Sequence, residues 1–119
     1  MTFKMNNRTW EILEKPAKYI QDVYKQKTDE EPPYLFGLSV ITDHIVYLNN
    51  EMCSDKARQT LLHELMHCYK TEYVSMSIDK IDEEILCDIS ANSHDIIHEI
   101  VEEYFKEKKK HGIMDKKSK

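Results

Sequence analysis

Apolar residues along the chain recur at helical spacing in three stretches and at strand-like spacing in two. The helical stretches are residues 17–25, 54–70 and 81–106. The strand-like stretches are residues 8–13 and 35–48. Helices and strands that follow one another without a regular βα repeat indicate an α+β fold.

The second strand-like stretch contains two β-rich runs, residues 35–41 and 44–48, with only Thr42 and Asp43 between them. So short a separation favours an antiparallel hairpin. Ser54 is a good N-cap for the helix that follows. We therefore expect a short antiparallel sheet, made of a strand and a hairpin, packed on the helix at 54–70 and on a long C-terminal helix.

The helix expected over residues 54–70 contains His63-Glu64-Leu65-Met66-His67, which has the His-Glu-x-x-His spacing of zinc hydrolases. Residues four apart lie on one face of a helix, so His63 and His67 can bind one metal ion. Glu64 lies beside them, and its carboxylate could accept a proton from water that the metal activates. The segment predicts a Zn²⁺ site with Glu64 as general base.

Zinc needs a third protein ligand, and its position separates two classes of metallopeptidase. One class continues the motif with a glycine and a histidine, but this chain has Lys70 and Tyr73 at those positions. The other class takes a Glu from a later helix, with an Asp four residues on that orients a ligand histidine. Glu84 and Asp88 have that spacing, so we expect Glu84 to bind the metal and Asp88 to support a histidine.

Several neighbouring residues are alternatives. Glu83 would be the ligand if the last helix were rotated by one residue, although its partner four residues on would then be Cys87. Cys87 or Cys68 could compete as a soft ligand, yet a free cysteine in such a helix is usually a small core residue. His94 and His98 lie about 15 and 21 Å along the helix from Glu84, too far to share its metal ion.

A peptidase also stabilises the oxyanion that develops on the substrate, commonly with a His, Tyr or Arg donor. Tyr69, Tyr73 and His44 are the candidates, and Tyr73 is preferred because Tyr69 points away from the metal face. The edge strand of the hairpin could hold an extended peptide by strand addition. This arrangement predicts a protein or peptide substrate.

The length of 119 residues suits one domain, which we place at residues 1–105, followed by a lysine-rich tail without fixed structure at 106–119. The tail has 7 Lys and 2 acidic residues, whereas the preceding part has 10 basic and 20 acidic residues. An acidic body disfavours nucleic acid as the main partner. No apolar run approaches the length of a membrane span or a signal peptide, so we expect a cytoplasmic protein with no membrane partner.

The residues resemble a known family at this point. The His63–His67 motif and the later Glu-x-x-x-Asp, together with the order of strands and helices, are similar to the small gluzincins of the ImmA/IrrE type from phages and mobile elements. The similarity is most specific over residues 60–92. It implies a minimal zincin-like core, with His63, His67 and Glu84 binding zinc and Glu64 activating water. SprT-like proteases share the motif but usually add a cysteine zinc ribbon, which this sequence lacks.

These observations predict a zinc-dependent peptidase of the bacterial cytoplasm that cleaves a protein partner by metal-activated water. The alternative is a non-catalytic binding or inhibitory module in which the metal site is structural or degenerate. A substitution of Glu64 separates the two, because only the peptidase needs proton transfer at that residue.

Overall fold

The computed structural model describes residues 1–74 and 83–117; for residues 83–89 and 111–117 it describes the backbone alone. Four strands and three helices follow one another in the order β1, β2, α1, β3, β4, α2 and α3. The strands are β1 (Thr2–Met5), β2 (Arg8–Lys15), β3 (Gly37–Val40) and β4 (Ile45–Asn49). The helices are α1 (Ala17–Thr28), α2 (Ser54–Tyr73) and α3 (Glu83–Lys117), and a single 3₁₀ turn, η1 (Ile41–Asp43), joins β3 to β4. The α+β class is confirmed.

The sheet is mixed and larger than the sequence predicted. Its strand order is β1-β2-β4-β3, in which β1–β2 and β3–β4 are antiparallel and β2–β4 is parallel. The hairpin of β3 and β4 is therefore confirmed. The expected all-antiparallel sheet is wrong at one pair, because the second hairpin strand, β4, lies beside β2 and runs parallel to it, while β3 is at the edge of the sheet. The connection through α1 returns the chain to the end of the sheet where β2 finishes, since Glu14 and Gly37 both lie opposite Leu48. Strand β3 therefore runs opposite to β2, and β4, which follows the hairpin turn, runs parallel to β2.

Strand β1 was not predicted. It is short, but Phe3 and Met5 alternate with polar residues, and both are buried. Asn6 and Asn7 form the tight turn to β2 with φ values of 50° and 65°. A two-residue hairpin turn with positive φ at both positions favours Gly, Asn and Asp, so the Asn-Asn pair was an available signal.

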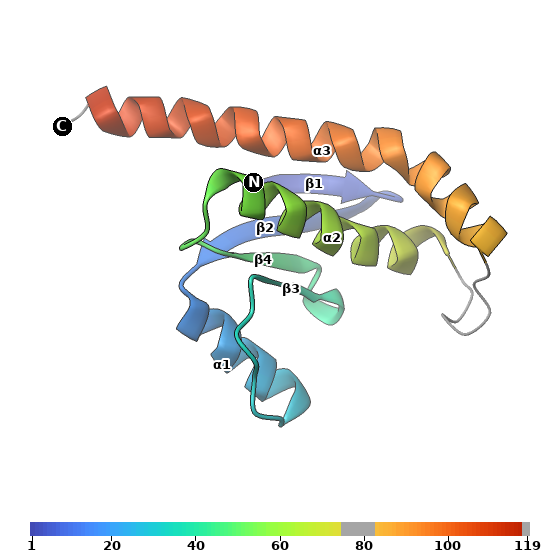
Figure 1. Ribbon diagram of the computed structural model, residues 1–119, viewed down its shortest axis with the longest axis horizontal. Helices are drawn as coiled ribbons and strands as arrows, with labels where there is room; N and C mark the ends of the chain where they lie inside the picture. The colour runs from blue at the N-terminus through green and yellow to red at the C-terminus, as the bar shows by residue number, and fades with distance from the viewer. Residues whose placement is uncertain (75–82, 118–119) are drawn as a thin grey trace.

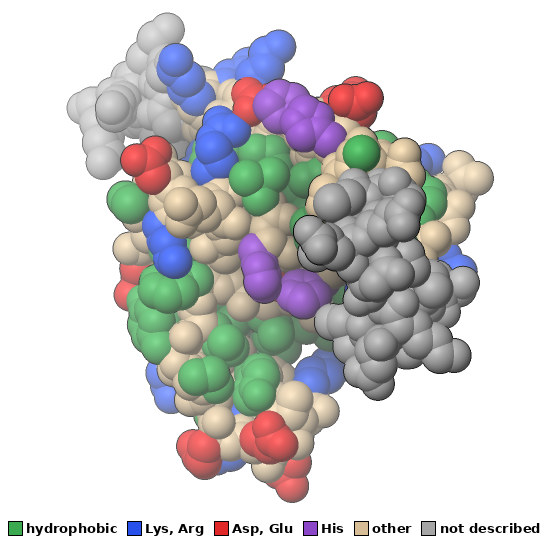
Figure 2. Space-filling view, turned by 45° about the vertical axis from the view of Figure 1, so that its right-hand side comes forward, with side chains coloured by type: hydrophobic (Ala, Val, Ile, Leu, Met, Phe, Trp, Pro, Cys, Tyr) green, Lys and Arg blue, Asp and Glu red, His purple; other side chains and the backbone are tan. Residues whose placement is uncertain are grey.

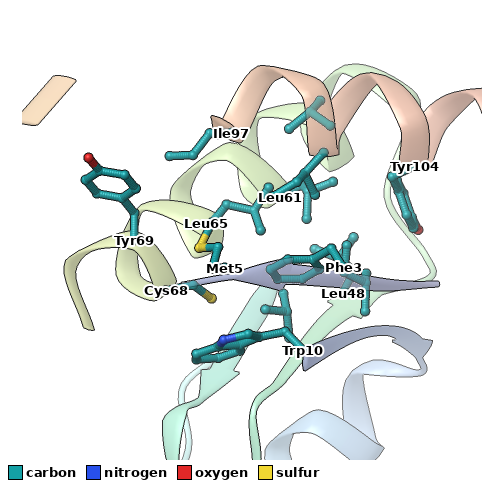
Figure 3. Packing of buried hydrophobic residues seen from close by; sticks show 14 residues of the cluster. Phe3, Met5, Trp10, Leu48, Leu61, Leu65, Cys68, Tyr69, Ile97 and Tyr104 are labelled. Carbon is teal, nitrogen blue, oxygen red and sulfur yellow. The ribbon is translucent and has the colours of Figure 1, made fainter. Parts of the chain in front are cut away.

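The sheet lies between two layers of helices, with α2 and α3 on one face and α1 on the other (Figure 1). The larger core joins the sheet to α2 and α3. Trp10, Leu48, Leu61 and Leu65 are at most 1% exposed within it (Figure 3). Each such side chain contributes about 1.5–3 kcal/mol by leaving water. These contacts fix α2 against the sheet.

The helix ends differ slightly from those expected. The N-cap of α2 is Cys53 rather than Ser54, which is the first helical residue, and no side chain caps that end. Helix α3 continues past the expected end near Lys106 to Lys117, because Lys and Glu are good helix formers. Whether the end of α3 frays in solution stays a prediction. Within the described part of the chain, no helix is long and apolar enough to span a membrane.

Candidate metal centre

Helix α2 presents different side chains to the core and to solvent. Leu61, Leu65 and Cys68 lie one above another on its core face and are fully buried. At about 100° per residue, His63 and His67 point away from that face and are exposed. Figure 2 shows histidine side chains, in purple, at the surface of the molecule. The packing of the apolar stripe therefore determines which way the two histidines face.

The two imidazoles have the geometry of a metal-binding pair. Their Nε2 atoms lie 3.2 Å apart, and their rings meet nearly at right angles, with centroids separated by 4.8 Å. Two nitrogens bound at 2.0–2.1 Å to one tetrahedral zinc ion would lie about 3.3 Å apart. An N–H···N hydrogen bond between the rings would satisfy the same distance without metal. The distance between the two nitrogens therefore suits a shared zinc ion and a hydrogen bond between the rings alike.

Glu64 lies beside the pair but is only 8% exposed. The ligand atoms of His63, Glu64 and His67 are all within 4.8 Å of one another, and no other such group of three occurs among the described residues. The Ser39 hydroxyl on β3 donates a hydrogen bond of 2.8 Å to Glu64 Oε1. One carboxylate oxygen is therefore held by the edge strand, in an orientation set by the fold.

Close packing of α2 on β3 depends on Gly37. A Cβ atom at this position would lie 2.7 Å from Thr60 Cγ2, 3.1 Å from Glu64 Cγ and 3.2 Å from the Tyr47 carbonyl oxygen. The missing side chain allows the helix to approach the strand closely enough for Ser39 to reach Glu64. Gly37 and Ser39 were not predicted as site residues, because their contacts with α2 join residues far apart in the sequence.

Two hollows lie between β3 and α2, one on each side of Glu64. The first, which we call the aromatic hollow, measures about 390 Å³ and is lined in part by Tyr34, Phe36, Lys56 and His63. The second measures about 230 Å³ and is lined in part by Ser39, His67 and Lys70. Glu64 lines both. We call the two hollows together the metal groove; β3, at the edge of the sheet, forms one side of it.

The expected contribution of α3 lies outside the described side chains. Glu84, its alternative Glu83, Asp88 and Cys87 all fall in residues 83–89, of which only the helical backbone is described. Helix α3 packs beside α2 through residues that include Ile97 and Val101. The roles of Glu84 as metal ligand and of Asp88 as its support stay predictions.

The candidate oxyanion donors receive no support from the geometry. Tyr73 is the last residue of α2, and its hydroxyl accepts a hydrogen bond of 2.7 Å from the backbone N–H of Asn6 in the β1–β2 turn. Tyr69 is buried in the core, and the ring of His44 packs edge-on against Trp10. None of the described hydrogen bonds joins these three residues to the metal groove, and the role of Tyr73 stays a prediction.

Cys68 is a core residue. It is fully buried, and burial raises the pKa of its thiol to about 12. Its side chain lies on the core face of α2, and it is not part of the group formed by His63, Glu64 and His67.

Comparison with known proteins adds no assignment: no family model, curated protein or solved structure matches the chain.

Proposed function

We propose that the protein is a zinc-dependent peptidase in which His63 and His67 bind the metal ion and Glu64 is the general base. The observation that carries the proposal is the position of Glu64, a nearly buried carboxylate beside two exposed imidazoles whose nitrogens are 3.2 Å apart. A carboxylate that served solubility alone would be expected in water. Glu84 is proposed as the third protein ligand.

The metal ion, Ser39 and Glu64 would each have a separate role in hydrolysis. Bound zinc would supply a Lewis acid that activates water and polarises a substrate carbonyl. The hydrogen bond from Ser39 leaves the second carboxylate oxygen of Glu64 available to accept the proton of the attacking water. The same Glu64 carboxyl group could then return that proton to the leaving amine.

The metal groove supports a peptide substrate. Within residues 1–74 and 83–117, β3 pairs with β4 alone, so its other edge can form hydrogen bonds with an extended segment. The two hollows extend along this strand on either side of Glu64, where side chains flanking a scissile bond would lie. A small-molecule substrate would not require so long a surface.

Glu64→Gln tests the proposal. The amide has nearly the same size and leaves the proposed zinc ligands intact, but it cannot accept a proton near neutral pH. We expect zinc content and thermal unfolding to stay unchanged, while hydrolysis falls by about 10²–10⁴-fold. The measurement compares the cleavage of partner proteins in the cells where the protein acts, and Glu51→Gln, an exposed carboxylate outside the groove, is the control.

A non-catalytic binder predicts a different outcome. Binding through the groove does not need proton transfer, so a zinc-loaded Glu64→Gln protein would keep its full biological effect. That result would contradict the peptidase and favour the binding module.

A further inference from the structure

Two exposed aromatic rings, those of Tyr34 and Phe36, line the aromatic hollow beside the metal site. Tyr34 is 55% exposed and Phe36 is 41% exposed, and their rings pack edge to face with centroids 5.3 Å apart. Both line the hollow that reaches His63 and Glu64. Large apolar side chains in water are costly, and two of them beside one hollow point to a ligand that covers them.

This aromatic pair is held in place by a buried side chain. Asn49 is 2% exposed, and its Nδ2 donates to the Tyr34 hydroxyl at 3.0 Å and to the Leu35 carbonyl oxygen at 3.2 Å. Its backbone N–H also donates to the Phe36 carbonyl oxygen at 2.9 Å. The segment before β3 is thus fixed by three bonds to one residue of β4, which lowers the entropy that a ligand must overcome on binding.

Each hollow of the metal groove has a lysine among its described lining residues. Lys56 places its Nζ 4.3 Å from the centroid of the Phe36 ring, and Lys70 lines the second hollow. Among the described residues that line the two hollows, Glu64 is the only acidic one. A ligand with an acidic residue beside an apolar one would match both the ring surface and the lysine.

We infer that the metal groove selects peptide segments that place a large aromatic or aliphatic side chain in the aromatic hollow, with an acidic residue close enough to pair with Lys56. This rests on the proposed function and names the substrate class for the same site. Tyr34, Phe36 and Lys56 are then specificity-determining residues, and Asn49 positions the two aromatic ones.

The test uses the full-length, zinc-loaded Glu64→Gln protein as bait for a phage-displayed library of random linear peptides. This variant retains the groove but should not consume its ligands. We expect the selected peptides to share a Phe, Tyr, Leu or Met next to Asp or Glu. Synthetic peptides with that consensus should lose about 10-fold or more in affinity when Phe36→Ala or Tyr34→Ala is added, since the apolar area then buried is smaller. Lys56→Glu should change the selected acidic residue to a basic one.

The chain offers a matched control on its opposite face. Lys15 lies over the ring of Tyr19, with its Nζ 4.9 Å from the ring centroid, and Tyr19 is 44% exposed. Tyr19→Ala removes a similarly exposed aromatic ring from a lysine pair that joins the end of β2 to α1. It should leave peptide selection and affinity unchanged.

The outcomes separate the two proposals. Selection without an apolar-acidic consensus, or a consensus that survives Phe36→Ala and Lys56→Glu, would overturn the specificity inference. The same result would leave the peptidase proposal standing if wild-type protein cleaves the selected peptides. A consensus that depends on these residues but is bound and not cleaved by wild type would support the specificity of the groove and contradict the peptidase.

Discussion

The chain contains two segments of the form His-acid-x-x-His, and they lie on neighbouring helices. His63-Glu64-Leu65-Met66-His67 is on α2, and His94-Asp95-Ile96-Ile97-His98 is on α3. Their surroundings differ. Glu64 is nearly buried and hydrogen-bonded to Ser39, whereas the side chain of Asp95 is fully exposed and reaches only His94, at 3.4 Å.

The histidine rings of the two segments also differ in how they are arranged. The rings of His63 and His67 are nearly perpendicular, with their Nε2 atoms 3.2 Å apart. The rings of His94 and His98 are stacked almost in parallel, with an interplanar angle of 8° and centroids 5.5 Å apart. Identical spacing therefore gives a converging pair of nitrogens in one helix and stacked rings in the other. The edge strand beside α2 thus adds, to the five-residue pattern, a structural reason to regard the first segment as the candidate site.

The largest effect is expected at Glu84, the proposed third zinc ligand, which would complete the metal site of the α2 segment and has no such role for the α3 segment. Glu84→Gln should weaken zinc binding by about 100-fold or more, because loss of a ligand exceeds the 10–100-fold typical of supporting partners. Titration against a chelator of known affinity measures the dissociation constant. Glu83→Gln is the matched control, and a greater loss there than at Glu84 would assign the ligand to Glu83.

Gly37→Ala tests the contact between α2 and the edge strand, which has no counterpart beside His94 and His98 among the described residues. The added methyl group would meet Thr60 Cγ2 at 2.7 Å, so we expect a loss of about 1–3 kcal/mol in the free energy of unfolding. Urea unfolding of the metal-free protein measures it without a contribution from bound zinc.

Thr60→Ser provides the control for this steric explanation, because it removes the Cγ2 atom in question. The double variant should recover part of the lost stability. Additive losses from the two substitutions would show that the contact with Thr60 is not the cause.

The smallest expected effect comes from converting the second segment to the full motif. Asp95→Glu gives α3 the His-Glu-x-x-His spacing, but it supplies neither a buried environment nor a strand to orient the carboxylate. In a His63→Ala, His67→Ala background, we expect elemental analysis to find no stoichiometric zinc. Restored zinc would mean that spacing alone is sufficient.

Much of this fold was predictable from local patterns, whereas the contacts that distinguish the two segments were not. The apolar periodicity gave α1, α2 and α3, and the β-rich runs gave the hairpin. The hairpin turn could not be typed, because η1 and the left-handed conformation of His44 replace the usual glycine. Parallel pairing of β2 with β4 follows from how the crossover packs, which no short segment specifies.

The candidate site, like the fold, was predictable from the sequence only in part. The spacing on α2 was sufficient to select His63, Glu64 and His67, which the structure brings together. The burial of Glu64, its bond to Ser39 and the small residue at Gly37 depend on how the sheet meets the helix. These long-range contacts are what the sequence alone does not specify.

The most direct test of the account is the zinc content of the purified protein and of its two histidine-pair variants. Elemental analysis should find about one zinc per chain in wild type, and about one in the His94→Ala, His98→Ala variant. The His63→Ala, His67→Ala variant should contain essentially none, while circular dichroism shows an unchanged helix content. Stoichiometric zinc that persists without His63 and His67, or disappears without His94 and His98, would contradict the assignment of the metal centre to α2.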